Sequence, residues 1–243
     1  MEFIMTLRMK VRNASTDSVY NRRMPGVFET APRVITPAGC LRFAVGSVVL
    51  LVGWLILSPY GHYVPPDFGR GFLSNKGDYF YSSGYVLGFY AQIFSAPIAL
   101  ACGTLQMSRS IRIGWPRVHR SLGKVYVALV LCLAAPGGVI MATRAYGGAS
   151  SVVCFALIGV LAWVFTLIAW RTARSGDYAA HGRWMGRSYL MMCSAVTLRL
   201  IHYLLQPLEL DPAVTYRTAA WLSWVPPLLA LELATRGDRL RKR

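Results

Sequence analysis

The chain has 243 residues, of which 55% are hydrophobic and 15% are charged, and its formal net charge is +16. A soluble domain usually carries about 25% charged residues, so this composition excludes an ordinary soluble globular protein. The hydrophobic residues come in long blocks, which indicates an integral membrane protein. Most of the 26 lysines and arginines lie between these blocks. Membrane topology therefore explains the positive charge, and no nucleic-acid partner is predicted.

Residues 1–40 form a basic, polar lead that contains Pro25, Pro32 and Pro37. The lead has no apolar segment followed by a small-residue cleavage site, so we do not expect a secretory signal. We expect it to be disordered or to lie on the membrane surface. The domain organisation that follows is this lead, a transmembrane domain over residues 41–236 and a basic tail over residues 237–243.

The apolar blocks predict an all-α, integral membrane helical bundle. A hydrocarbon core of about 30 Å requires roughly 20 residues of helix. Each block must be helical, because backbone groups in hydrocarbon need internal hydrogen-bond partners. About six transmembrane helices are expected, over residues 41–58, 83–106, 123–143, 150–170, 187–206 and 217–234. Prolines inside the blocks predict kinks or local unwinding at Pro97, Pro136, Pro226 and Pro227.

The distribution of basic residues predicts the orientation. The lead through Arg42, the gaps 107–124 and 171–187, and the tail after residue 234 together hold 21 lysines and arginines. The alternate gaps hold four. Positive residues accumulate on the cytoplasmic side, so we expect both termini to be cytoplasmic in a bacterial inner membrane. The surplus charge also predicts contacts with anionic lipids at the cytoplasmic face.

The four histidines lie two near each predicted membrane face. His119 and His181 precede the third and fifth predicted helices, and His62 and His202 lie towards the outer side. Two imidazoles on facing helices are able to hold a b-type haem, which is the candidate cofactor. His181 and His202 are separated by about 31 Å of helix, which is long for two haems inside one bilayer. The alternative is that these histidines hydrogen-bond loop backbone or lipid phosphate. No other metal site is predicted.

Arg199 lies inside the fifth predicted helix, where a charge is costly and normally faces the bundle interior. It shares one helix face with Ser188 and His202. Glu232 and Gln92 are candidate partners for it, although Glu232 lies nearer the cytoplasmic end. One interpretation is that Arg199 is structural and forms a polar contact between helices. The other is that it binds a carboxylate, a haem propionate or a quinone oxygen, or forms a step in an ion path.

Four short motifs in the second half of the chain are similar to those of a known family. They are HRSLGKVYV (119–127), HGRWMGRSYLMM (181–192), TLR (197–199) and WLSWVPPLLALE (221–232). The pattern resembles a family of bacterial predicted multi-pass membrane proteins of unknown function. The Pro226–Pro227 pair departs from it, since a polar residue is expected there. The resemblance implies a polar core that includes His119, Arg120, His181, Arg187, Arg199 and Glu232.

Three functional hypotheses follow. None of the standard motifs of soluble enzymes is present, which favours a structural or accessory subunit of a membrane complex. The histidines and Arg199 favour instead a redox protein that binds b-type haem or quinone; if the chain is an enzyme, we expect a membrane oxidoreductase. The polar face of the fifth helix favours a transporter of ions or small solutes, although no internal repeat supports this hypothesis.

Overall fold

The computed structural model describes residues 53–54, 57–69, 71–74, 76–82 and 84–240, with the backbone alone for Pro59 and residues 236–240. The chain divides into two units, residues 1–49 and 50–243, and every described residue belongs to the second unit. The predicted basic lead, most of the first predicted span (41–58) and the last residues of the predicted basic tail lie outside the described residues.

The described part of the chain is helical, as the sequence predicts. A π-helical turn, η3 (Val130–Ala134), joins α6 to α7, and short 3₁₀ turns lie at η1 (Ser58–His62), η2 (Gly71–Leu73) and η4 (Gln206–Leu208). The α-helices in chain order are α3 (Gly77–Phe80), α4 (Tyr85–Met107), α5 (Arg109–Gly114), α6 (Pro116–Leu129), α7 (Ala135–Ala142), α8 (Ala149–Arg174), α9 (Tyr178–Leu205), α10 (Pro212–Leu222) and α11 (Val225–Leu240).

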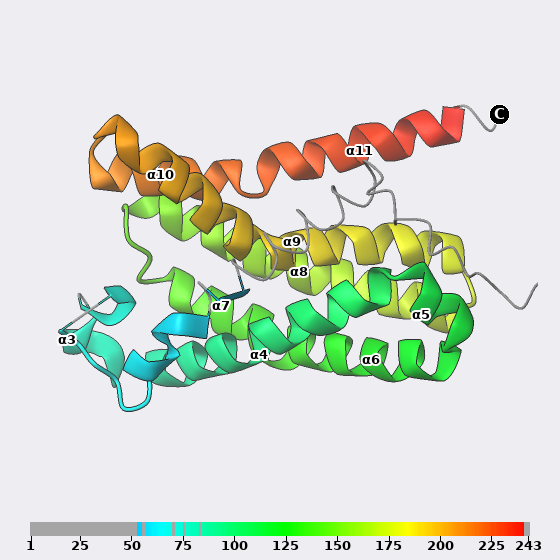
Figure 1. Cartoon of the computed structure of the whole chain (residues 1–243), viewed down its shortest axis with the longest axis horizontal. Coiled ribbons are helices and arrows are strands. Elements are labelled where there is room, and N and C mark those ends of the chain that lie inside the picture. The colour runs from blue at the N-terminus through cyan, green and yellow to red at the C-terminus, as the bar shows by residue number, and fades with distance from the viewer. Residues whose placement is uncertain (1–52, 55–56, 70, 75, 83, 241–243) are drawn as a thin grey trace, which may run out of the picture. The chain divides into compact units, whose positions relative to one another are not determined.

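Four of the described helical segments are long and apolar enough to cross a bilayer. They are Tyr85–Met107, Pro116–Ala142, Ala149–Arg174 and Tyr178–Leu208. They form a ring of antiparallel neighbours, in which α4 packs on α6 and α7, α7 on α8, α8 on α9, and α9 on α4 (Figure 1). Both α6 and α9 pack against α4 and α8, which places α6 and α9 at opposite corners of the ring. These two helices run parallel to each other.

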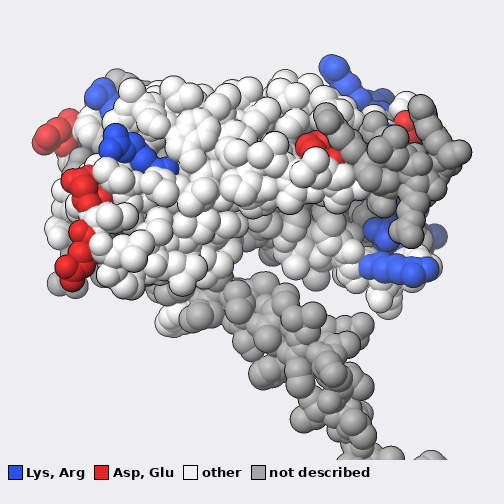
Figure 2. Space-filling view, turned by 90° about the horizontal axis from the view of Figure 1, so that it is seen from above, with Lys and Arg blue, Asp and Glu red and all other residues white. Residues whose placement is uncertain are grey.

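On the face seen in Figure 2, most charged side chains lie near the two ends of the bundle, and few lie on the surface between them. We call the end that contains residues 108–119 and 171–183 the basic end. We call the end that contains residues 57–84, 143–148 and 206–213 the loop end. An uncharged band between two charged ends is the surface expected of a protein that crosses a bilayer.

Local sequence signals set where α6 and α9 begin. Pro116 occupies the first turn of α6, where its missing N–H is not needed. Asp177 caps α9, because its carboxylate accepts a hydrogen bond from the Ala180 amide at 2.9 Å. Both helices therefore begin several residues before the apolar blocks from which they were predicted, and they include His119 and His181.

Pro136 changes the helix as predicted, through a π-helical turn. The Ala135 amide bonds to the Val130 carbonyl, five residues back, and Pro136 has no N–H to donate. The Leu131 carbonyl loses both possible partners within its helix. It accepts a hydrogen bond from the indole Nε1–H of Trp163 on α8 at 3.2 Å.

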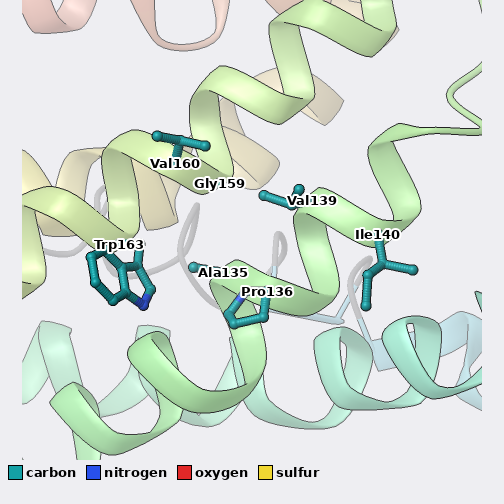
Figure 3. A pocket seen from close by; sticks show the side chains of 7 residues that line it. All are labelled: Ala135, Pro136, Val139, Ile140, Gly159, Val160 and Trp163. Atoms are coloured by element: carbon teal, nitrogen blue, oxygen red, sulfur yellow. The ribbon is translucent and has the colours of Figure 1, made fainter. Parts of the chain in front are cut away.

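An apolar groove between α7 and α8 lies beside this turn (Figure 3). Its volume is about 330 Å³. Since the indole N–H of Trp163 is already bonded, the groove presents a hydrocarbon surface. Its lining residues are Ala135, Pro136, Val139, Ile140, Gly159, Val160 and Trp163.

The sixth predicted span, 217–234, is divided into α10 and α11. Ser223 and Trp224 separate the two helices, and Pro226 and Pro227 lie in the first turn of α11. Prolines are tolerated in a first turn but would leave carbonyls unbonded in the middle of a continuous helix. Pro97 behaves differently, because α4 continues through it as one helix.

The segment before α4 packs against the loop end of that helix. Tyr63, Leu73 and Phe80 form a buried aromatic and aliphatic cluster with Tyr85 and Phe89 of α4. The Tyr90 hydroxyl donates to the Tyr63 carbonyl at 2.8 Å, which also ties the segment to α4. The described residues of this segment therefore contribute to the core at the loop end.

Candidate functional site

Three consecutive residues of α9 connect this helix to its neighbours. Arg187 binds Glu232 of α11 through two hydrogen bonds, Nε to Oε1 at 2.5 Å and Nη2 to Oε2 at 2.8 Å. The Arg187 guanidinium also lies over the Trp184 ring, 4.6 Å from its centroid. The Tyr189 hydroxyl bonds to Thr104 of α4 at 2.6 Å. These contacts hold α9 against two other helices at one level of the bundle.

Ser188, between these two residues, joins the opposite corners of the ring. Its hydroxyl bonds to the Tyr126 hydroxyl of α6 at 2.7 Å and to the Thr166 hydroxyl of α8 at 2.6 Å. Tyr126, Thr166 and Ser188 are fully buried. A buried hydroxyl without a partner would be costly, so this satisfied chain fixes α6 and α9 in one register.

The Tyr126–Ser188 bond also sets which other residues of α6 and α9 face each other. His119 lies seven residues before Tyr126, and His181 lies seven residues before Ser188. Seven residues are two helical turns, or about 10 Å of rise, and return to the same helix face. Because the two helices run parallel, His119 and His181 lie at the same height near the basic end. The electrostatic interaction between the two rings agrees with this placement.

The hydrogen bond of His181 determines which ring nitrogen is available. Its Nδ1 lies 2.8 Å from the Ala169 carbonyl oxygen. A carbonyl only accepts, so Nδ1 carries the proton and the Nε2 of the neutral ring carries a lone pair. An imidazole held by backbone through Nδ1 with Nε2 available is the usual arrangement of a metal-binding histidine. The bond between His181 and the Ala169 carbonyl is also expected if the histidine is structural and only hydrogen-bonds the backbone.

Two buried polar atoms near the same height have no hydrogen-bond partner among the described residues. They are Nδ1 of His119 and Nε2 of Gln106 on α4. A Cβ added to Gly123, one turn from His119, would lie 3.4 Å from that Gln106 nitrogen, so Gly123 and Gln106 are neighbours. We call His119, His181, Gln106 and Gly123 the paired-histidine site. Unpaired buried polar atoms in a native protein require an explanation, such as a bound water or a ligand.

The donor set of the paired-histidine site fits a haem iron better than a hard cation. It offers two imidazoles and an amide but no carboxylate, and no group of three metal-binding side chains is found in the described part of the chain. Two neutral imidazoles from separate helices suit haem iron, whereas calcium and magnesium prefer oxygen ligands. The charge of Arg112 acts on His119, which places a cation beside the site.

The two histidines predicted on the outer side lie in different environments at the loop end. His62 is exposed, and its Nδ1 lies 3.7 Å from the Asp67 carboxylate. His202 is half-buried, and its ring meets Tyr216 of α10 edge to face, with 6.1 Å between the centroids. No contact between His62 and His202 is present in the described residues.

The polar residues expected around Arg199 are distributed over the bundle. Glu232 is engaged by Arg187 and not by Arg199. The Gln92 Oε1 is buried without a hydrogen-bond partner among the described residues, beside Gly138 of α7. Arg120 is exposed at the basic end. Arg199 itself is half-buried, and its charge acts on tyrosines at the loop end.

Sequence reasoning did not identify Gln106, Gly123, Tyr126 or Thr166 as parts of a site. A signal for two of them is present in the sequence. His119, Gly123 and Tyr126 have the same spacing as His181, Met185 and Ser188. Two parallel helices with equal spacing present facing residues at equal heights. Gln106 and Thr166 have no comparable signal.

The comparison with known families matches most of the transmembrane part. The family described as "Predicted membrane protein (DUF2306)" matches residues 89–235, which include all of the paired-histidine site and Arg199. No curated protein and no solved structure matches the chain. The match agrees with the uncharged band and the long apolar helices, and the chain belongs to this DUF2306 family of predicted membrane proteins.

Proposed function

We propose that this protein is a membrane redox protein that binds one b-type haem between His119 and His181. The supporting observation is the register of α6 and α9, which follows from the 2.7 Å bond between Tyr126 and Ser188. Bound haem would supply reversible one-electron transfer. The loop-end histidines, His62 and His202, are not included, so the proposal is for one haem per chain.

Three residues of the paired-histidine site, together with Arg112, have a role in this proposal. His181 is oriented by the Ala169 carbonyl and offers Nε2 as a ligand. His119 offers the second imidazole from the opposite corner of the ring. Gly123 has no side chain, so Gln106 packs directly against the surface of α6 there. Arg112 would pair with a propionate carboxylate.

The test is the visible absorption spectrum of the full chain, purified in detergent from haem-replete cells. We expect a Soret band that sharpens on reduction with dithionite in the wild type. His119→Ala and His181→Ala should each lose at least 90% of the bound haem. His62→Ala is the matched control, because His62 is exposed and lies at the other end of the bundle. Its spectrum should equal that of the wild type.

Two results would contradict the proposal. One is a colourless wild-type protein, and the other is an equal loss of haem in His62→Ala and His119→Ala. A colourless protein that co-purifies with a defined partner in mild detergent would instead support a structural or accessory subunit.

We also propose that the basic end faces the cytoplasm of a bacterial inner membrane, with both termini on that side. The excess of arginine and lysine in the gaps at this end supports the orientation. The same residues would bind anionic lipid head groups. A green fluorescent protein fused to the C-terminus should fluoresce, because it folds in the cytoplasm, and an alkaline phosphatase fused there should be inactive. The opposite pattern would reverse the orientation.

A further inference from the structure

A cluster of hydrogen-bond donors lies at the loop end, far from the paired-histidine site. Arg199 and His202 are three residues apart on α9 and share a face. Tyr216 of α10 meets the His202 ring edge to face, and it interacts electrostatically with Tyr85, the first residue of α4. We call Tyr85, Arg199, His202 and Tyr216 the loop-end donor cluster. Its members come from three helices.

Several hydrogen-bond donors of this cluster have no acceptor among the described residues. The His202 Nδ1 and the Tyr85 hydroxyl are buried and have no hydrogen-bond partner among the described residues. Tyr85 is 3% exposed, so its hydroxyl has little access to water. Arg199 forms no hydrogen bond or ion pair within the described part of the chain, although its guanidinium carries five N–H donors.

The positive charge of Arg199 is directed towards the aromatic residues at this end. Burial raises the pKa of Tyr60 to about 12, and the neighbouring Tyr63 raises it as well, whereas the charge of Arg199 acts in the opposite direction. The same charge acts on Tyr63 and Tyr216. Among the described residues, the groups on which the charge of Arg199 acts are therefore tyrosine hydroxyls.

None of the acidic residues that the structure describes at the loop end forms an ion pair with Arg199. Asp67 binds the Gly69 amide at 2.8 Å and faces His62, and Asp211 caps α10 through the Val214 amide at 2.9 Å. Asp78 and Glu209 are exposed. The predicted span 41–58 contains no Asp or Glu. A half-buried cation without a counter-charge is costly in an apolar surrounding.

We propose that the loop-end donor cluster is a binding site for an anionic phosphate or carboxylate group. Arg199 provides the charge and a two-pronged donor, which suits an oxyanion. His202 and the tyrosine hydroxyls supply further donors. The anion comes either from a lipid head group in the adjacent leaflet or from a small soluble molecule, and the two sources share this chemistry.

The test measures thermal stabilisation of the full chain in the uncharged detergent dodecyl maltoside. A ligand that binds the folded state raises the unfolding temperature in proportion to the logarithm of its concentration above Kd. The soluble probe is inorganic phosphate, at an ionic strength kept constant with sodium chloride. The lipid probe is phosphatidylglycerol, with digalactosyldiacylglycerol as the lipid that lacks phosphate.

The variants are chosen to separate a bound anion from general charge effects. Arg199→Gln removes the charge and should weaken binding by about 10-fold to 100-fold, as expected for a lost charge-assisted hydrogen bond. Arg199→Lys keeps the charge but loses the planar fork, so it should bind more weakly than wild type even if Arg199→Gln fails to fold. Arg144→Gln is the matched control, because Arg144 is an exposed arginine at the same end.

Each outcome decides the proposal. Stabilisation by phosphate that increases with the logarithm of its concentration and depends on Arg199 supports a small soluble anion. Stabilisation by phosphatidylglycerol alone, absent with digalactosyldiacylglycerol, supports a lipid head group. The proposal is overturned if neither probe stabilises the wild type, if Arg199→Lys binds as tightly as wild type, or if Arg144→Gln is weakened as much as the Arg199 variants.

Discussion

The Arg187–Glu232 pair provides a quantitative test of how α11 is held against α9. The Arg187 side chain is 10% exposed and that of Glu232 is 33% exposed. Glu232→Gln would leave the buried guanidinium without its counter-charge. Breaking a buried pair in this way costs about 3–5 kcal/mol. Because Glu232 retains some contact with solvent, we expect the lower end of this range, about 3 kcal/mol of unfolding free energy.

A double variant separates the lost pair from the buried charge that remains. Arg187→Met combined with Glu232→Leu removes both charges and keeps side chains of similar volume. Replacing a buried ion pair by apolar residues is often neutral, so the double variant should lie within about 1 kcal/mol of wild type. It should therefore be more stable than Glu232→Gln alone.

The assay is reversible unfolding in mixed micelles, with sodium dodecyl sulphate as the denaturant and tryptophan fluorescence as the signal. Glu209→Gln serves as the control, since Glu209 is an exposed carboxylate at the opposite end of the bundle. It should change the unfolding free energy by less than about 0.5 kcal/mol. The reasoning is refuted if Glu232→Gln behaves like this control, or if the double variant is as unstable as the single one.

Three further substitutions test local features of the fold by the same unfolding assay. Trp163→Phe leaves the Leu131 carbonyl without its donor and should cost about 1–3 kcal/mol; no loss would mean that the bond is not formed. Gly103→Ala puts a Cβ 2.5 Å from the Tyr189 ring and should cost about 1–3 kcal/mol, whereas an unchanged stability would show that this contact relaxes freely. Asp177→Ala removes the cap of α9 and should cost about 1 kcal/mol, with Asp177→Asn close to wild type; equal losses in both would argue against capping.

Much of the helical architecture follows from hydropathy. Predicted spans 83–106 and 150–170 agree with α4 and α8 to within a few residues. The helices predicted at 123–143 and 187–206 begin earlier in the structure, because a proline in the first turn and an aspartate cap extend them through basic sequence. Hydropathy gives only the length of the apolar segment, whereas the first-turn proline and the aspartate cap determine where the backbone becomes helical. The length of an apolar block is therefore shorter than the length of the helix that contains it.

The candidate site was less predictable than the fold. The sequence singled out His119 and His181, but their common height depends on the Tyr126–Ser188 bond between two helices at opposite corners. The pairing of Glu232 with Arg187 depends on where α11 begins, and the unwinding predicted at Pro226 and Pro227 did not specify that point. The equal spacing along α6 and α9 is a sequence signal for the first of these contacts, whereas the Arg187–Glu232 pair has none.

The most direct test of the account is the haem content per chain, from the reduced-minus-oxidised difference spectrum and the protein concentration of the purified wild type. The register of α6 and α9 predicts one haem per chain, with an α-band on reduction typical of two histidine ligands. A value of zero would return His119 and His181 to structural roles. A value of two would require the loop-end histidines to bind haem as well, which the account contradicts.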